Sequence, residues 1–191
     1  MGRILLGLLV DRIRQALTQP GFDVEEPDEP FTRAAVAVVW APGPELIMIK
    51  RAEHDGDPWS GHMAFPGGRV DPEDDGALAA ALRESREELA LDLSGAQVLG
   101  ELTPIRTPFR ARGHVHYVHA FVFASGPVPT LTPNREVESV HRFHLDRLLA
   151  GEGRDTFEWR GWEMPCVRLD GCFIWGMSLR LIDEVLERIR G

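Results

Sequence analysis

The stretch that decides the fold runs from residue 67 to residue 91 and reads GGRVDPEDDGALAAALRESREELAL. From Gly76 to Ala90 the spacing of apolar and charged residues predicts a helix of about 14 residues. At roughly 100° per residue, Glu84, Glu87 and Glu88 fall within an arc of roughly 100°, and the leucines lie nearly opposite. One face of this helix is expected to pack on the core, while the other presents three carboxylates together.

A solvated acidic surface is the ordinary explanation of such a face, but two features argue for a metal site instead. Glu84 and Glu88 are like charges four residues apart, which lowers helix stability. Oxygen ligands on one face would gain from Mg²⁺ or Mn²⁺, which favour carboxylate, carbonyl and water. The Gly67-Gly68 turn before the helix would let a backbone carbonyl approach such an ion. We therefore interpret the carboxylates as metal ligands.

This segment resembles the signature of the Nudix hydrolase family: Gly, five residues, Glu, seven residues, then Arg-Glu-apolar-x-Glu-Glu-x-Gly-apolar. The chain matches it with Gly68, Asp75 and the run from Arg83 to Leu91. It departs in four places: six residues separate Gly68 from the acid, the acid is Asp75 instead of Glu, Ser85 replaces an apolar residue, and Ala90 replaces Gly. The Arg-Glu-x-x-Glu-Glu core and its distance from Asp75 are intact.

The resemblance implies an α+β fold, a Nudix-type α/β/α sandwich with a mixed β-sheet, that hydrolyses a nucleoside diphosphate linked to another group. It implies a cofactor, Mg²⁺ or Mn²⁺, that polarises the pyrophosphate and activates a water molecule. The implied metal ligands are the carbonyl of Gly67 and the carboxylates of Glu84, Glu87 and Glu88, oriented by Arg83. Glu84 is the first candidate for the general base, and Glu136 and Glu138 in a later loop are the alternatives.

A narrower resemblance, to the coenzyme A pyrophosphatase branch of the family, covers about residues 30 to 185. It rests on the extra residue before Asp75 and on three segments: 49–52, Gly61 to Pro72, and 174–178. That branch splits coenzyme A into 3′,5′-ADP and 4′-phosphopantetheine. It usually has a second Arg after the position of Arg51, whereas the loop 53–60 of this chain contains none.

Other arginines could compensate for that missing side chain. The resemblance implies a substrate contact from Arg51, and Arg106, Arg110 and Arg112 lie in one strand-to-loop segment that could bind phosphate. The altered loop also favours a second enzyme, a diphosphatase for ADP-ribose, nucleotide sugars or dinucleotides. A third alternative is a catalytically silent Nudix domain that senses a nucleotide, although the intact carboxylates argue against it.

Length and charge bound the remaining alternatives. The 191 residues fit a single domain, with an N-terminal helix near 3–18 and an acidic connector up to residue 30 before a catalytic core from 31 to 191. The net charge of −9 disfavours a nucleic-acid partner, whereas a divalent metal would still admit a nucleotide diphosphate as substrate. Cys166 and Cys172 fit reduced thiols.

Neither export nor a membrane span is predicted. Charged residues interrupt the first apolar run at once, and no apolar stretch approaches the roughly 18 residues of a spanning helix. We therefore expect a cytoplasmic protein without a membrane partner, and the sequence leaves open whether it forms a homodimer.

The remaining elements follow from periodicity and turn residues. Strands are expected near 32–40, 45–51, 97–106, 114–124 and 137–144, a further segment over 162–169 runs to a turn at Asp170-Gly171, and helices are expected at 145–149 and 177–190. They mix without the regular alternation of βαβ units, which favours an α+β sandwich.

Overall fold

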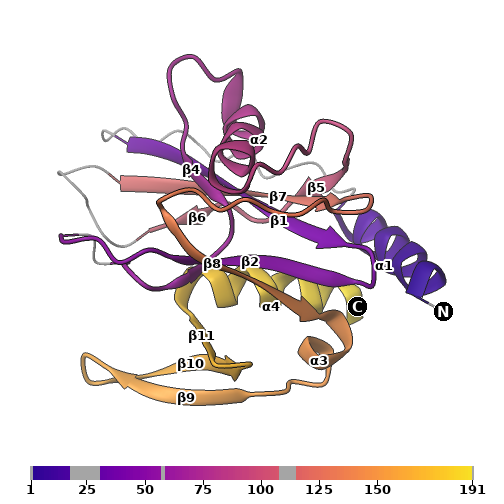
Figure 1. Ribbon diagram of the computed structural model, residues 1–191. Helices are drawn as coiled ribbons and strands as arrows, with labels where there is room; N and C mark the ends of the chain where they lie inside the picture. The colour runs from indigo at the N-terminus through magenta and orange to yellow at the C-terminus, as the bar shows by residue number, and fades with distance from the viewer. Residues whose placement is uncertain (1, 18–30, 57–58, 108–114, 191) are drawn as a thin grey trace.

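The computed structural model describes residues 2–17, 31–56, 59–107 and 115–190. Within these ranges the chain forms two sheets and four helices (Figure 1). The helices are α1 (Gly2–Leu17), α2 (Gly76–Leu89), α3 (Leu145–Leu149) and α4 (Gly176–Arg190). The acidic connector expected up to residue 30 lies outside the described residues.

The larger sheet is mixed. Strands β1 (Phe31–Ala41) and β7 (Val115–Ala124) run parallel, and its other described pairs are antiparallel. Its main path is β3-β2-β1-β7-β5, while β4 pairs with β1, β6 with β7 and β8 with β2. The bounds of these strands are β2 (Glu45–Arg51), β3 (Met63–Ala64), β4 (Gly67–Arg69), β5 (Gln97–Glu101), β6 (Ile105–Arg106) and β8 (Val137–His144).

Helices cover both faces of this sheet, and the residues of β1 alternate between them. Ala35, Ala37 and Val39 belong to the core cluster that includes α2, whereas Val38 and Trp40 belong to the cluster that includes α1 and α4. Figure 1 shows α2 on one side of the sheet and α4 on the other. The predicted α/β/α sandwich on a mixed sheet is therefore confirmed.

A second, three-stranded sheet was only partly predicted. It consists of β9 (Arg154–Trp159), β10 (Trp162–Leu169) and β11 (Cys172–Trp175), in the order β11-β10-β9. Strand β9 was not expected. It joins β10 through Arg160 and Gly161, both with positive φ, as a two-residue hairpin turn requires. Because Asn, Asp or Gly usually occupies the position of Arg160, the sequence lacks the ordinary hairpin signal here.

The strand expected over 97–106 divides into β5 and β6. Pro104 lies between them and has no N–H to donate to a neighbouring strand. The short strands β3 and β4 occupy a segment that was expected to be loop and turn. None of the described helices is long and apolar enough to cross a membrane.

Helix α2 ends on Ala90, which adopts a left-handed conformation with φ 54°. The N–H groups of Ala90 and Leu91 donate to the carbonyls of Arg86 and Ser85 at 2.9 and 3.2 Å, which caps the last turn. Glycine is the favoured residue at such a helix end, because it has no Cβ to clash in this conformation. This explains why the family pattern has Gly at this position.

The change Ala90→Gly should therefore stabilise the protein by about 0.5–1 kcal/mol. Glycine removes the strain of the left-handed conformation, but it also raises the conformational entropy of the unfolded chain, which cancels part of the gain. The free energy of unfolding in urea measures this difference. The matched control is Ala150→Gly at the end of α3, where φ is −69° and no strain is relieved. Equal effects of the two substitutions would contradict the explanation.

Candidate active site

Helix α2 carries the three glutamates of the motif on one side, and their side chains range from exposed to buried. The side chain of Glu87 is 55% exposed and that of Glu84 is 16% exposed, whereas Glu88 is 2% exposed. The three carboxylates therefore share one side of the helix, but Glu88 is buried rather than presented to solvent. A buried carboxylate needs hydrogen-bond partners, and the neighbouring turn supplies one.

The turn Gly67-Gly68 lies against both the sheet and α2. Strand β4 pairs with β1, with Gly67 opposite Val36, and the Gly67 N–H donates to Glu88 Oε2 at 2.9 Å. A Cβ on Gly67 would overlap the Ala35 carbonyl, and a Cβ on Gly68 would overlap the Glu84 carboxylate. Gly67 is therefore needed for this backbone to lie against β1, and Gly68 for the Glu84 carboxylate to approach it.

Arg83 connects most of the acidic groups around this turn. Its Nε and Nη2 donate to the two carboxylate oxygens of Asp74 at 3.0 and 2.9 Å. Its Nη1 donates to Glu84 at 2.9 Å and to Glu87 at 3.3 Å, and Nη2 also donates to the Arg69 carbonyl at 3.0 Å. The guanidinium thus fixes the helix carboxylates relative to the loop before the helix.

Asp74, which the sequence reasoning did not select, is the acid that reaches this site. Its side chain is 7% exposed, and the hydrogen bonds from Arg83 lower its pKa. Asp75 is exposed at the start of α2 and makes no side-chain capping bond. Counting from Gly68 would have identified Asp74, because the five-residue spacing of the family signature leads to it.

Ser85 accounts for another departure from the family pattern. It is fully buried, and its hydroxyl donates to the Ala81 carbonyl at 2.7 Å. This bond to the carbonyl four residues earlier pairs the buried hydroxyl. A small polar residue can therefore replace the usual apolar one.

Burial and mutual repulsion raise the pKa of two helix carboxylates. Desolvation raises the pKa of Glu88 to about 7, with further increases from the charges of Glu84 and Glu136, while the Gly67 N–H and Arg51 oppose them. Desolvation also raises the pKa of Glu84, although Arg83 lowers it and Glu136 adds to the increase. The charge of Glu136 therefore acts on both carboxylates, and that of Arg51 acts on Glu88.

Backbone bonds explain how Glu136 comes to lie there. The N–H of Asn134 donates to the Glu88 carbonyl at 2.8 Å, and the N–H of Ala52 donates to the Glu136 carbonyl at 2.8 Å. The loop before β8 is thus attached to the end of α2 and to the residue after Arg51. Glu138, the other candidate base, instead accepts a bond from Lys50 Nζ at 2.7 Å.

Among the other predicted arginines, only Arg106 lies within the described residues. Arg106 is exposed on β6, and its charge is not among those that shift the pKa values of Glu84 and Glu88. Arg110 and Arg112 lie outside the described residues.

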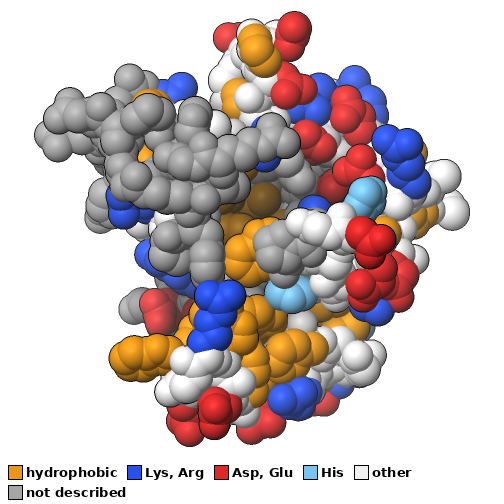
Figure 2. Space-filling model, turned by 90° about the vertical axis from the view of Figure 1, so that its left-hand side faces the viewer, with side chains coloured by type: hydrophobic (Ala, Val, Ile, Leu, Met, Phe, Trp, Pro, Cys, Tyr) orange, Lys and Arg blue, Asp and Glu red, His pale blue; other side chains and the backbone are white. Residues whose placement is uncertain are grey.

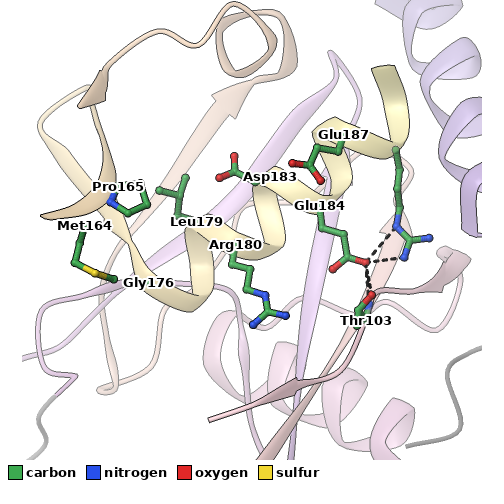
Figure 3. Close-up of a pocket in the computed structure, with 10 residues that line it drawn as sticks. Thr103, Met164, Pro165, Gly176, Leu179, Arg180, Asp183, Glu184 and Glu187 are labelled. Carbon is green, nitrogen blue, oxygen red and sulfur yellow. Dashed lines mark hydrogen bonds and ion pairs between the residues drawn. The ribbon is translucent and has the colours of Figure 1, made fainter. Parts of the chain in front are cut away.

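A pocket of about 600 Å³ lies elsewhere, between α4, β10 and the connection from β5 to β6 (Figure 3). Glu184 accepts bonds there from the N–H and the hydroxyl of Thr103, at 2.9 and 2.8 Å, and from Arg188. These bonds attach α4 to the sheet. None of the α2 carboxylates lines this pocket, so we assign no part of the reaction to it.

Comparison with known proteins identifies the family. A model of the NUDIX domain matches residues 30–164. The uncharacterised Nudix hydrolase NudL of Yersinia pestis is 32% identical over 169 residues, which cover 82% of this chain and 79% of the relative. NudL of Yersinia pseudotuberculosis matches to the same extent.

Two solved structures agree in fold. The NUDIX domain of Shewanella oneidensis NrtR, complexed with ADP ribose, aligns with a TM-score of 0.53 and 17% identity over 88% of this chain and 94% of that one. The bifunctional NMN adenylyltransferase/ADP ribose pyrophosphatase of Francisella tularensis aligns with a TM-score of 0.59 and 15% identity, over 97% of this chain and 47% of that one.

The chain belongs to the Nudix hydrolase family. It is a pyrophosphohydrolase that acts on nucleoside diphosphate derivatives. Nudix hydrolases generally use divalent metal ions.

The residues around α2 fit such an ion. Two acids with raised pKa values lie beside Glu87, and the glycine turn leaves no side chain between them and the backbone. In the described residues, no three His, Cys, Asp or Glu side chains already converge as a metal site. Glu84 and Glu87 are held by Arg83 and Glu88 by Gly67, so an ion would compete for these groups.

The raised pKa of Glu88 predicts a pH-dependent stability of the chelated protein. The folded-state pKa of about 7 exceeds the ordinary value of 4.5, so the folded protein binds the proton more tightly. Stability should therefore rise as pH falls from 8 through 7, by roughly 1 kcal/mol near pH 6. Glu88→Gln should remove this component and should be more stable than wild type at pH 8.

Urea unfolding with a chelator at pH 6 and pH 8 measures this difference. The control is Glu87→Gln on the same helix, whose exposed side chain should leave the wild-type profile unchanged. Parallel profiles for wild type and Glu88→Gln would show that the buried carboxylate costs no stability.

Proposed function

We propose that this enzyme cleaves coenzyme A or its esters into 3′,5′-ADP and the corresponding 4′-phosphopantetheine. The two segments that resemble the coenzyme A branch, 61–72 and 174–178, lie against each other, which supports this substrate. Ser178 Oγ donates to the Met63 carbonyl at 2.9 Å, and the rings of His62 and Trp175 are 5.3 Å apart. The observation that carries the hydrolase chemistry is the buried Glu88 carboxylate bonded to Gly67.

In this proposal Glu84, Glu87, Glu88 and the Gly67 carbonyl hold Mg²⁺ or Mn²⁺. When bound, the ion supplies positive charge for the pyrophosphate and favours ionisation of the attacking water. Arg83 acts as a positioning residue, because its two bonds to Asp74 fix the guanidinium while Nη1 reaches the helix carboxylates. Asp74 therefore contributes through Arg83 rather than by touching the substrate.

The reaction exchanges one phosphorus–oxygen bond for another. The water oxygen bonds to one phosphorus, the bond from that phosphorus to the bridging oxygen breaks, and the proton of the water passes to a carboxylate. We assign this general base to Glu84, and Glu136 is the second candidate because its charge acts on both Glu84 and Glu88. The bond to Lys50 makes Glu138 a poorer candidate.

Substrate contacts are assigned to Arg51 and to the segment that contains Arg106 and Arg112. Arg51 is supported by its effect on the pKa of Glu88, which indicates a cation close to the reacting groups. We also propose that the chain acts as one catalytic domain, because Ile13 and Leu17 of α1 are buried in the core with α4.

A second candidate substrate is ADP-ribose or a dinucleotide, favoured by the loop 53–60. That loop contains Glu53 and Asp55 but no Arg, and Ser60 Oγ accepts a bond from the His54 N–H and donates to the His54 carbonyl at 2.7 and 2.8 Å. Its carboxylates would repel the 3′-phosphate of coenzyme A. ADP-ribose lacks this phosphate, and the NrtR domain was solved with ADP ribose.

Hydrolysis should require the α2 carboxylates and a divalent metal. Chelation should abolish activity, Mg²⁺ or Mn²⁺ should restore it, and Glu84→Gln should lower kcat on the order of 10²-fold or more. The control is Glu184→Gln, because the two side chains are similarly exposed, at 16% and 17%. Steady-state rates at one fixed metal concentration test this prediction. Equal kcat values for Glu84→Gln and Glu184→Gln would remove Glu84 from the mechanism.

Substrate choice should reflect the missing loop arginine. We expect the enzyme to cleave coenzyme A. One buried charge-assisted contact to the 3′-phosphate would favour coenzyme A over 3′-dephospho-coenzyme A by about 10- to 100-fold in kcat/KM, and we expect a smaller preference than this. If Arg106 or Arg112 compensates, its change to Ala should reduce kcat/KM for coenzyme A more than for the dephospho form. Cleavage of ADP-ribose or a dinucleotide, but of no coenzyme A derivative, would reject the branch assignment and retain the family.

A further inference from the structure

The connection between β7 and β8 is attached to the end of α2 by backbone bonds. The Thr132 N–H donates to the Leu89 carbonyl at 2.9 Å. The Asn134 N–H donates to the Glu88 carbonyl at 2.8 Å. Carbonyls in the last turn of a helix have no partner within the helix, and the connection satisfies these two. Figure 1 shows this connection running below α2 before the chain enters β8. Asn134 is thereby fixed next to a residue of the motif.

Asn134 also closes a turn with its own side chain. The Val137 N–H donates to the Asn134 carbonyl at 3.3 Å, and the Glu136 N–H donates to Asn134 Oδ1 at 2.8 Å. Asn is favoured at the first position of such turns, because its side chain accepts a bond from the backbone two residues later. The Asn134 side chain therefore fixes the backbone of Glu136.

The backbone in turn sets the place of the Glu136 carboxylate. Glu136 lies two residues after Asn134, so their Cα atoms are at most about 7 Å apart. From the other side, the Ala52 N–H donates to the Glu136 carbonyl at 2.8 Å. Among the described residues no side chain donates a hydrogen bond to the Glu136 carboxylate, whereas Glu138 accepts one from Lys50. Glu136 thus depends on its turn for its position.

The charge of Glu136 faces the acidic side of α2. Burial raises the pKa values of Glu84 and Glu88, and the charge of Glu136 raises both further. In Figure 2, acidic side chains gather in the upper part of the surface, at the height of α2. A divalent ion held by the helix carboxylates would be attracted by this additional charge.

We propose that Asn134 is a positioning residue of the metal site, because its side-chain oxygen holds the turn that places the Glu136 carboxylate beside Glu84 and Glu88. This inference rests on the metal ligands of the proposed function. It does not depend on which carboxylate is the general base or on the leaving group of the substrate. Asn134 acts through Glu136 and does not itself hold the ion.

Titration of the full chain with Mn²⁺ alone, followed by electron paramagnetic resonance, measures the affinity for the ion without substrate. Glu136→Gln should raise the Kd for Mn²⁺ by about 3- to 10-fold, since a solvated carboxylate near a divalent ion loses its charge. Asn134→Ala should raise it by a similar factor. The double variant should bind Mn²⁺ no more weakly than Glu136→Gln alone, because the two changes remove the same interaction. Asn134→Ser, whose hydroxyl accepts the same bond more weakly, should recover part of the affinity.

The matched control is Asp92→Ala. Asp92 Oδ1 accepts a bond from the Ser94 N–H at 2.9 Å, so this variant also removes a side-chain bond to the backbone two residues later, in a different loop. Asp92→Ala should lower stability in urea, as Asn134→Ala does, but should keep the Kd for Mn²⁺ close to that of wild type, because Glu136 keeps its place. A purely structural role of Asn134 would make the two variants alike in both measurements.

Additive effects of Asn134→Ala and Glu136→Gln overturn the proposal, and so does a wild-type Kd in either single variant. If circular dichroism shows that Asn134→Ala is unfolded, Asn134→Ser replaces it in the same cycle. Hydrolysis of coenzyme A and ADP-ribose by wild type is measured separately. A chain that cleaves neither but shows the coupled Mn²⁺ affinities keeps this inference and loses the proposed substrates. A wild-type chain that binds no Mn²⁺ rejects the proposed metal ligands and this inference together.

Discussion

The hydrogen bond from the Gly67 N–H to the Glu88 carboxylate is the constraint on which the site depends. A carboxylate that is 2% exposed is costly unless the protein supplies partners, and this bond connects α2 directly to a strand paired with β1. Small residues allow that approach, because Ala80 and Ala81 of the helix pack in one cluster with Ala35 and Ala37 of the sheet. A larger side chain in this layer would move the helix away from the turn.

This close approach concentrates negative charge. Glu84, Glu87 and Asp74 surround one guanidinium, that of Arg83, while the charges of Glu88 and Glu136 add to that of Glu84. The raised pKa values of Glu84 and Glu88 show that ionisation of these two carboxylates is unfavourable in the protein without a metal ion. A divalent ion would offset the repulsion between these carboxylates. Metal binding should therefore also stabilise the packing of α2 against β4.

The sequence predicted the sandwich and the helix face because both follow from short-range periodicity. It could not predict that Glu88 is buried, since burial depends on β4, a three-residue strand without a pattern of its own. The choice of Asp75 over Asp74 had a similar cause: the spacing from Arg83 favoured one acid and the spacing from Gly68 the other. Contact with Arg83 selects Asp74. Strand β9 was missed because its hairpin turn places Arg160 where the usual residues are Asn, Asp and Gly.

The difference between short-range patterns and contacts between distant segments also explains why the sequence identifies the family more readily than the substrate. The carboxylates, Arg83 and the glycine turn come from one continuous segment, 67–88, so a single motif contains nearly all of the proposed reaction chemistry. Groups proposed to contact the rest of the substrate, Arg51 and the segment around Arg106, lie outside this motif in the sequence. These segments can change without disturbing the bonds that hold α2 to β4. Substrate preference can therefore diverge between relatives whose hydrolytic chemistry is the same, and a single altered loop such as 53–60 carries more information on the substrate than the motif does.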